Sequence, residues 1–158
     1  TYTYLLTSGA EAAIIDPVLE HVDRDHQLIS EIGVKLVWIL ETHIHADHIT
    51  GAHRLRERTG AKIGLSQTSG ARGVDSLLAD GQLIPLGGTK IHCLATPGHT
   101  DGCMSYLWEG RVFTGDALLI RGTGRTDFQS GSARTLFKSL REKILSLPGD
   151  TQVYPGHD

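Results

Sequence analysis

The chain has few cysteines and no long apolar run. Cys93 and Cys103 are the only two cysteines in 158 residues, and they form no C-x-x-C pair. A disulfide framework is therefore not indicated, and two thiols in apolar stretches favour a reducing, intracellular setting. No apolar run reaches the roughly 20 residues that span a bilayer, so we expect no membrane insertion. No signal-peptide pattern is present either.

An excess of charge of one sign is also missing. The net charge is −3, from 15 Lys and Arg against 18 Asp and Glu, which argues against general nucleic-acid binding. An apolar fraction of 39% in 158 residues is enough for one domain with a substantial core. We expect a single domain over residues 1–158. Because the chain starts in a strand-like segment without Met, we also expect that it lacks N- and C-terminal extensions.

Histidine, in contrast, is abundant. Nine histidines occur, and the segment Thr42–His48 reads T-H-I-H-A-D-H. Three imidazoles and a carboxylate within six residues would be costly to desolvate together without a cation, so this cluster predicts a metal site. We interpret the isolated histidines as surface or core residues: His21, His26, His53 and His92.

The hydrophobic pattern predicts a mixture of hairpins and helical crossovers. We expect strands at 1–6, 11–15, 34–40, 61–65, 82–86, 90–95, 103–108, 111–114 and 152–154, and helices at 22–32, 49–59 and 132–147. Residues 67–80 are weakly patterned and predict a loop with a short helical turn. Tight turns are too frequent for a single parallel sheet. The pattern favours two sheets flanked by helices, an α/β four-layer αββα sandwich.

Three more donors follow predicted strands and come directly after glycine: His99 in P-G-H-T, Asp116 in G-D-A and His157 in P-G-H. Strand ends collect along one edge of a sandwich, so these residues are candidates to join the first cluster. The combined donor set is His43, His45, Asp47, His48, His99, Asp116 and His157. Nitrogen and oxygen donors suit zinc, iron or manganese. Two zinc ions would favour hydrolysis, and one ferrous ion on two histidines and a carboxylate would favour oxygenation. From the donors alone, a binuclear hydrolase is favoured.

These motifs resemble the metallo-β-lactamase superfamily over nearly the whole chain. Within it, the segment G-D-A-L-L-I-R-G-T-G-R-T-D-F-Q at 115–129 resembles the persulfide dioxygenases, the family of the ethylmalonic encephalopathy protein. The resemblance implies one Fe(II) per chain, held by His43, His99 and Asp116 as the metal-binding and catalytic residues. The remaining donors would lie around this metal or hold a second one: His45, Asp47, His48 and His157.

The same resemblance implies oxidation of glutathione persulfide with O2 to sulfite and glutathione. Arg125, with Arg121 second, is the candidate for binding the carboxylates of glutathione, although Arg125 could equally pair with Asp127. Asp16 either orients the histidine segment or caps the turn before Pro17, and we favour the cap. We also expect a homodimer and a sulfurtransferase (rhodanese), either as a partner or as a fused domain. The expected location is intracellular, in the bacterial cytoplasm or the mitochondrion.

Two other functions stay open at this point. A glyoxalase II-like thioesterase, a hydroxyacylglutathione hydrolase, would use the full donor set for two metals, with zinc as the alternative metal. An inactive metal-binding domain would keep the fold without substrate binding. Metal content and oxygen uptake would separate these alternatives.

Overall fold

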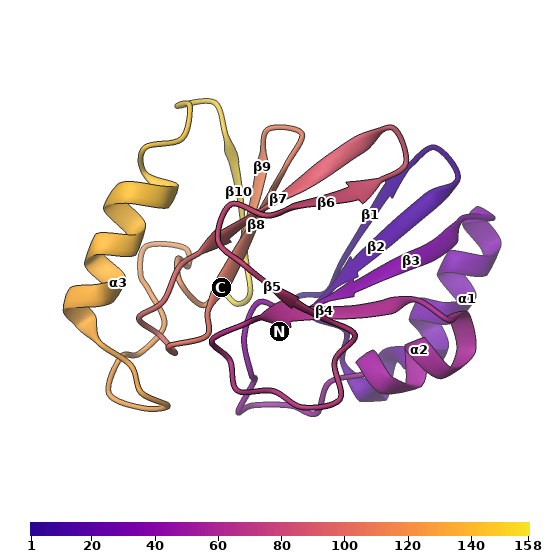
Figure 1. Ribbon diagram of the computed structural model, residues 1–158, viewed down its shortest axis with the longest axis horizontal. Helices are drawn as coiled ribbons and strands as arrows, with labels where there is room; N and C mark the ends of the chain where they lie inside the picture. The colour runs from indigo at the N-terminus through magenta and orange to yellow at the C-terminus, as the bar shows by residue number, and fades with distance from the viewer.

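The computed structural model describes residues 1–158, which form two five-stranded sheets packed face to face (Figure 1). The strands of the first sheet run in chain order: β1 (Tyr4–Ser8), β2 (Glu11–Ile15), β3 (Lys35–Leu40), β4 (Lys62–Ser66) and β5 (Ser76–Leu78). The second sheet has the order β10 (Gln152–Pro155), β9 (Arg111–Gly115), β8 (Met104–Trp108), β7 (Thr89–Ala95) and β6 (Leu83–Leu86). In both sheets, strands that lie side by side are consecutive in the chain.

Helices cover the outer face of each sheet. A 3-10 turn (Leu19–His21) leads into α1 (Val22–Ile32), which packs with α2 (Ala52–Thr59) beside the first sheet. The helix α3 (Ala133–Ser139) and a π-helical turn (Leu140–Ile144) lie at the opposite side, beside the second sheet (Figure 1). The predicted four-layer αββα sandwich is confirmed. No helix is long and apolar enough to cross a bilayer.

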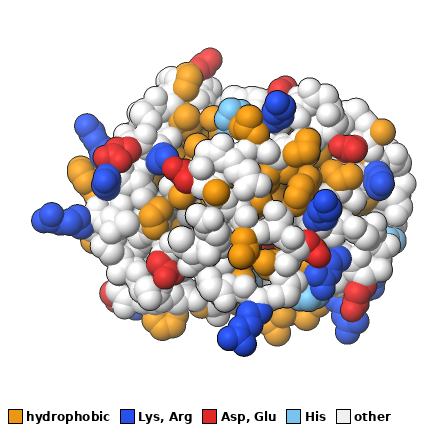
Figure 2. All heavy atoms as spheres, viewed as in Figure 1, with side chains coloured by type: hydrophobic (Ala, Val, Ile, Leu, Met, Phe, Trp, Pro, Cys, Tyr) orange, Lys and Arg blue, Asp and Glu red, His pale blue; other side chains and the backbone are white.

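Strand alternation explains how the layers bury their apolar residues. On β2, Ala13 and Ile15 belong to the core between the sheets, whereas Ala12 and Ile14 belong to the core under α1 and α2. Successive side chains of a strand point to opposite faces, so one apolar strand serves both layers. A third core, which includes Leu136, lies under α3. On the face in Figure 2, acidic and basic side chains are interspersed rather than segregated.

Three predicted segments differ in the structure. The weakly patterned segment 67–80 contains no helical turn; instead β5 pairs in parallel with β4 and buries Leu78. Sheet pairing with a neighbouring strand overrides the weak local pattern there. The predicted helix 132–147 ends as an α-helix at Ser139 and continues as the π-helical turn. Phe137, which the helical spacing places on the apolar face, is 68% exposed. The second predicted helix starts at Ala52 rather than 49.

Candidate metal centre

The seven predicted donors all follow the C-terminal ends of strands. Those at positions 43–48 follow β3, and His99, Asp116 and His157 follow β7, β9 and β10 respectively. The structure brings these four loops, which are up to 114 residues apart in the chain, to one edge of the sandwich. This edge is the candidate metal centre.

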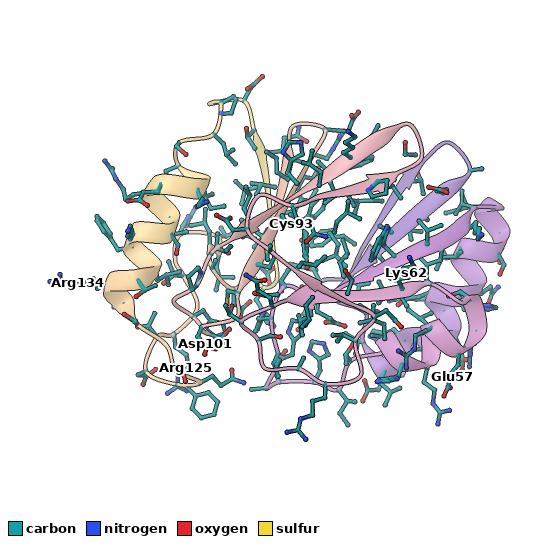
Figure 3. All side chains as sticks on the ribbon, viewed as in Figure 1. Glu57, Lys62, Cys93, Asp101, Arg125 and Arg134 are labelled. Atoms are coloured by element: carbon teal, nitrogen blue, oxygen red, sulfur yellow. The ribbon has the colours of Figure 1, made fainter.

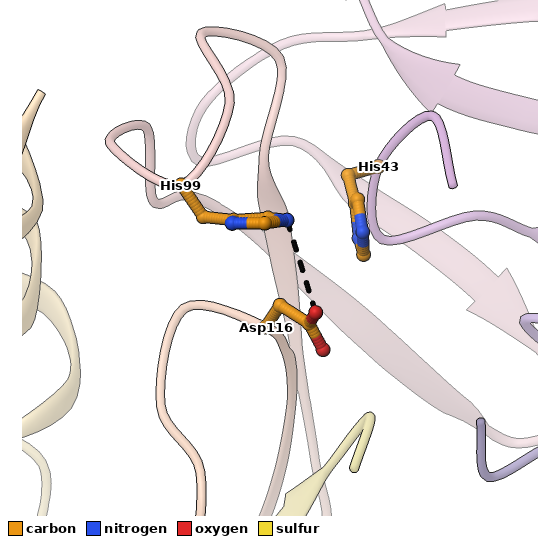
Figure 4. Close-up of side chains that lie close together, drawn as sticks. All are labelled: His43, His99 and Asp116. Carbon is orange, nitrogen blue, oxygen red and sulfur yellow. Dashed lines mark ion pairs between the residues drawn. The ribbon is translucent and has the colours of Figure 1, made fainter. Parts of the chain in front are cut away.

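His43, His99 and Asp116 form a group whose ligand atoms lie within 4.8 Å of one another (Figure 4). His99 Nε2 is 3.8 Å from Asp116 Oδ2, and the rings of His43 and His99 stand edge-on, with centroids 4.9 Å apart. His43 and His99 are buried. Two imidazoles and one carboxylate at these separations can share a single divalent ion.

A backbone carbonyl fixes the tautomer of His99. Its Nδ1 lies 2.7 Å from the carbonyl oxygen of Arg125, which can only accept a hydrogen bond. Nδ1 therefore carries the hydrogen, and Nε2 presents its lone pair towards Asp116. This arrangement, in which the far nitrogen of a histidine is held by an acceptor, is typical of metal-binding imidazoles.

Asp16 and Thr42 hold His43 in the same way. The buried Asp16 carboxylate accepts hydrogen bonds from Thr42 N at 2.7 Å and from Thr42 Oγ1 at 2.8 Å. Because the Thr42 hydroxyl donates to Asp16, it accepts from His43 Nδ1 at 3.0 Å, which leaves His43 Nε2 free as a donor to a metal. Burial, with the nearby charge of His45, lowers the pKa of His43 to about 4, so its imidazole is neutral at pH 7. Our interpretation of Asp16 as a turn cap was wrong, because its carboxylate orients the histidine segment.

His45 faces two buried carboxyl groups. Its Nε2 lies 3.1 Å from Asp16 Oδ1 and 3.6 Å from Glu41 Oε2. Burial and the negative charge of Asp16 raise the pKa of Glu41 to about 8. Glu41 was not among the predicted site residues, and its only signal in the sequence is its place directly after the buried strand β3. On its other side, His45 groups with Asp47 and His48 within 4.8 Å.

His157 links the two groups of donors. Its Nδ1 lies 2.7 Å from Asp116 Oδ1, and its Nε2 lies 3.1 Å from Asp47 Oδ2. The structure thus places His157 beside Asp116 rather than within the group of His43 and His99. All seven predicted donors lie in one network.

Several buried atoms of this network make no hydrogen bond with the protein. They are Glu41 Oε2, both ring nitrogens of His45, and His48 Nε2. Buried polar atoms without partners are costly, and a cation among them removes that cost. The thiol of Cys103 is buried, receives a hydrogen bond from the Thr100 amide and shares one with the Thr100 hydroxyl, and burial raises its pKa. The donors therefore fit a metal that prefers nitrogen and oxygen.

The two arginines predicted to bind substrate lie in the loop after β9. Figure 3 shows Arg125 in this loop at the rim of the molecule. Its guanidinium pairs with Asp127 through contacts of 2.8 and 3.0 Å, so the predicted intraloop pairing is present, and its carbonyl anchors His99. Arg121 is exposed and has a left-handed backbone, with φ of 61°. Substrate binding by either arginine stays a prediction.

A cavity of about 250 Å³ opens beside the histidine segment. Its lining combines His43, His45 and His48 with apolar and polar residues from the loop after β3, α2, β4 and the loop after β4. The apolar residues are Ile44, Ala52, Ile63, Leu65, Ala71 and Val74, and the other polar ones include Glu41, Thr50, His53 and Arg72. The metal centre therefore adjoins a cavity of mixed polar and apolar lining.

Comparisons with known proteins agree with this geometry. The metallo-beta-lactamase superfamily matches residues 1–157. Human "Persulfide dioxygenase ETHE1, mitochondrial" is 50% identical over 163 residues, covering 100% of this chain and 64% of its own length. The crystal structure of ETHE1 from Myxococcus xanthus superposes with a TM-score of 0.97 at 51% identity, covering 100% of this chain and 71% of that one. A hydroxyacylglutathione hydrolase of Anaeromyxobacter dehalogenans is 37% identical over 99% of this chain and 61% of its own length.

The αββα sandwich, with a histidine- and aspartate-rich edge, defines a metalloprotein of the metallo-β-lactamase fold. The chain belongs to the metallo-β-lactamase superfamily and, within it, to the ETHE1 family. It spans 64% of the length of the human ETHE1 sequence that it matches. The predicted resemblance is confirmed, and a metal at this edge is supported by both the family and the donor groups.

Proposed function

We propose that this chain carries the catalytic centre of a persulfide dioxygenase, which oxidises glutathione persulfide with O2 to sulfite and glutathione. One persulfide, one O2 and one water give one glutathione, one sulfite and two protons, so the terminal sulfur is oxidised and O2 is reduced. The observation that carries the proposal is the group of His43, His99 and Asp116, in a chain 50% identical to a persulfide dioxygenase.

In this proposal His43, His99 and Asp116 hold one Fe(II). A ferrous ion on two histidines and a carboxylate supplies oxygen-activating redox chemistry and keeps coordination positions open for substrates. The chain's own contribution is to orient these donors. Asp16 and Thr42 fix the ring of His43, the Arg125 carbonyl fixes that of His99, and His157 holds one oxygen of Asp116.

Iron analysis and oxygen uptake test the proposal together. Purified protein is expected to contain about one iron per chain and to consume one O2 per glutathione persulfide. Asp116→Ala should abolish both iron retention and uptake. Asp101→Ala is the matched control, because Asp101 is an exposed acid in the loop after β7 whose side chain has no partner in the centre. Loss of iron in both variants would contradict the assignment of Asp116.

A second function has a specific observation in its favour. The full donor set of a two-metal site is present, and the chain is 37% identical to a hydroxyacylglutathione hydrolase. Two zinc ions per chain, with hydrolysis of S-lactoylglutathione and no oxygen uptake, would establish the thioesterase instead. Bound metal with neither activity would indicate a binding domain. The homodimer and the sulfurtransferase partner stay predictions.

A further inference from the structure

One hydroxyl group lies among the donors outside the His43, His99 and Asp116 group. Thr1 Oγ1 is 2.7 Å from Asp47 Oδ2, 3.2 Å from His48 Nδ1 and 2.9 Å from His157 Nε2. These side chains come from the loops after β3 and β10, so residues more than 100 positions apart converge on this single oxygen. The sequence pattern predicts Thr1 only as the first residue of a strand.

The hydroxyl has the hydrogen-bonding capacity that this position needs. A threonine hydroxyl donates one hydrogen bond and accepts two. Asp47, as a carboxylate, can only accept, so it takes the donated hydrogen, and His48 Nδ1 can donate to the hydroxyl oxygen. His157 donates through Nδ1 to Asp116, so its Nε2 donates to the hydroxyl only when both of its ring nitrogens carry hydrogen. Asp47 and His48 are therefore satisfied at this point by a neutral group of the chain itself, and His157 lies in contact with the same oxygen.

The hydroxyl also lies between donors that a metal would draw together. A metal shared by Asp47, His48 and His157 needs each donor at about 2.0–2.2 Å. Asp47 and His48 do belong to a metal-sized group, but its third member is His45, and His157 is not part of any such group. A cation cannot enter among these three side chains unless the hydroxyl leaves.

The backbone around Thr1 keeps the hydroxyl in place. The amide of Tyr2 donates to the carbonyl of Gly156 at 2.8 Å, next to His157. Thr3 Oγ1 donates to the carbonyl of Asp16 at 2.8 Å, beneath the histidine segment. The segment is thus tied to the loop after β10, which supplies His157, and to Asp16, whose carboxylate holds Thr42 at the start of the histidine segment. The strand β1 begins directly after it.

We propose that Thr1 determines the metal stoichiometry of the centre: its hydroxyl fills the place of a second cation among Asp47, His48 and His157, and so restricts the centre to one metal. This inference rests on the proposed one-metal centre. It makes Thr1 a specificity-determining residue that distinguishes a mononuclear from a binuclear site in the same fold.

Co²⁺ titration of metal-free protein tests this role. The unchanged protein should bind one Co²⁺ tightly, and Thr1→Ala should bind a second at least tenfold more tightly than the unchanged protein does. Thr1→Ser keeps the hydroxyl and should restore binding of one Co²⁺. Thr7→Ala is the matched control, because it removes an exposed hydroxyl further along β1 that does not touch the donors or the contacts that position Thr1. Imidazole N–H resonances shifted by Co²⁺ should indicate two bound histidines in the unchanged protein and additional ones in Thr1→Ala.

The outcomes separate the inference from the proposed function. One Co²⁺ in both the unchanged protein and Thr1→Ala would overturn the role of Thr1 and leave the one-metal centre standing. Two tightly bound Co²⁺ in the unchanged protein would also overturn it, and oxygen uptake with glutathione persulfide would then decide the function separately. Absence of any Co²⁺ binding would overturn the metal centre itself.

Discussion

Replacing Asp16 should weaken both the fold and the metal centre. Its carboxylate is 1% exposed and accepts two hydrogen bonds from Thr42. A hydrogen bond to a charged group contributes about 1.5–3 kcal/mol, so Asp16→Ala should lower the free energy of unfolding by roughly 3–5 kcal/mol. Asp16 also has a left-handed backbone with φ of 51°, which Ala tolerates less well than Asp. At roughly 2–4 °C per kcal/mol for a domain of this size, the melting temperature should fall by about 10 °C.

The effect on the metal follows from the chain of contacts through Thr42 to His43. Loss of a group that orients a metal ligand typically lowers metal affinity by about 10–100-fold. Calorimetric melting of metal-free protein and Fe(II) or Co²⁺ titration measure the two effects separately. Asp16→Asn keeps one oxygen acceptor and tolerates the same backbone, so we expect a smaller loss in both measurements.

Asp25→Asn is the control that changes a buried acid away from the metal centre. Asp25 is 5% exposed on α1 and pairs with Arg24, without contact to the histidine segment. It should change stability without changing metal affinity. Unchanged metal affinity in Asp16→Ala would refute the conclusion that Asp16 orients His43.

Three further outcomes test other parts of the structure. Gly98→Ala should destabilise the protein by about 2–4 kcal/mol in chemical denaturation, because Gly98 has φ of 141° and an added Cβ would lie 2.4 Å from Leu136 Cα. Tyr106→Phe should lower the free energy of unfolding by about 1–2 kcal/mol in the same measurement, because the buried carbonyl of Glu41 loses the 2.7 Å hydrogen bond from the tyrosine hydroxyl. An unchanged free energy of unfolding would contradict this contact. Asp80→Asn should cost about 1 kcal/mol or less at neutral pH, since its partner Lys143 lies 2.6 Å away on a partly exposed surface. Burial acts to raise the pKa of Asp80, but hydrogen bonds from Lys143 and the Ala95 amide lower it overall. The stability difference between Asp80→Asn and the unchanged protein should therefore disappear as the pH falls below about 4 and Asp80 becomes protonated. A stability difference that stays constant with pH would contradict the ion pair.

Much of the fold could be predicted from local patterns. The hairpin of β1 and β2, the helix α1 and the buried strand β3 all occur near their predicted bounds, because hydrophobic period and turn residues act over a few positions. The strand β5 was missed, since its three residues are stabilised by pairing with β4 rather than by their own pattern. The π-helical turn after Ser139 was not predicted either, because the apolar residues over 132–147 have the spacing of one continuous helix.

By itself, the sequence determined which donor types are present and that they follow strand ends, because a strand and the loop after it are contiguous in the chain. The tertiary structure decided which donors share a position, which nitrogen of each histidine is free, and which buried groups hold them. Asp16 and Thr42 lie 26 residues apart, and Thr1 and His157 lie 156 apart. The first contact forms when β2 pairs with β3 within the first sheet, and the second forms when the two sheets pack, so neither can be predicted from a local pattern.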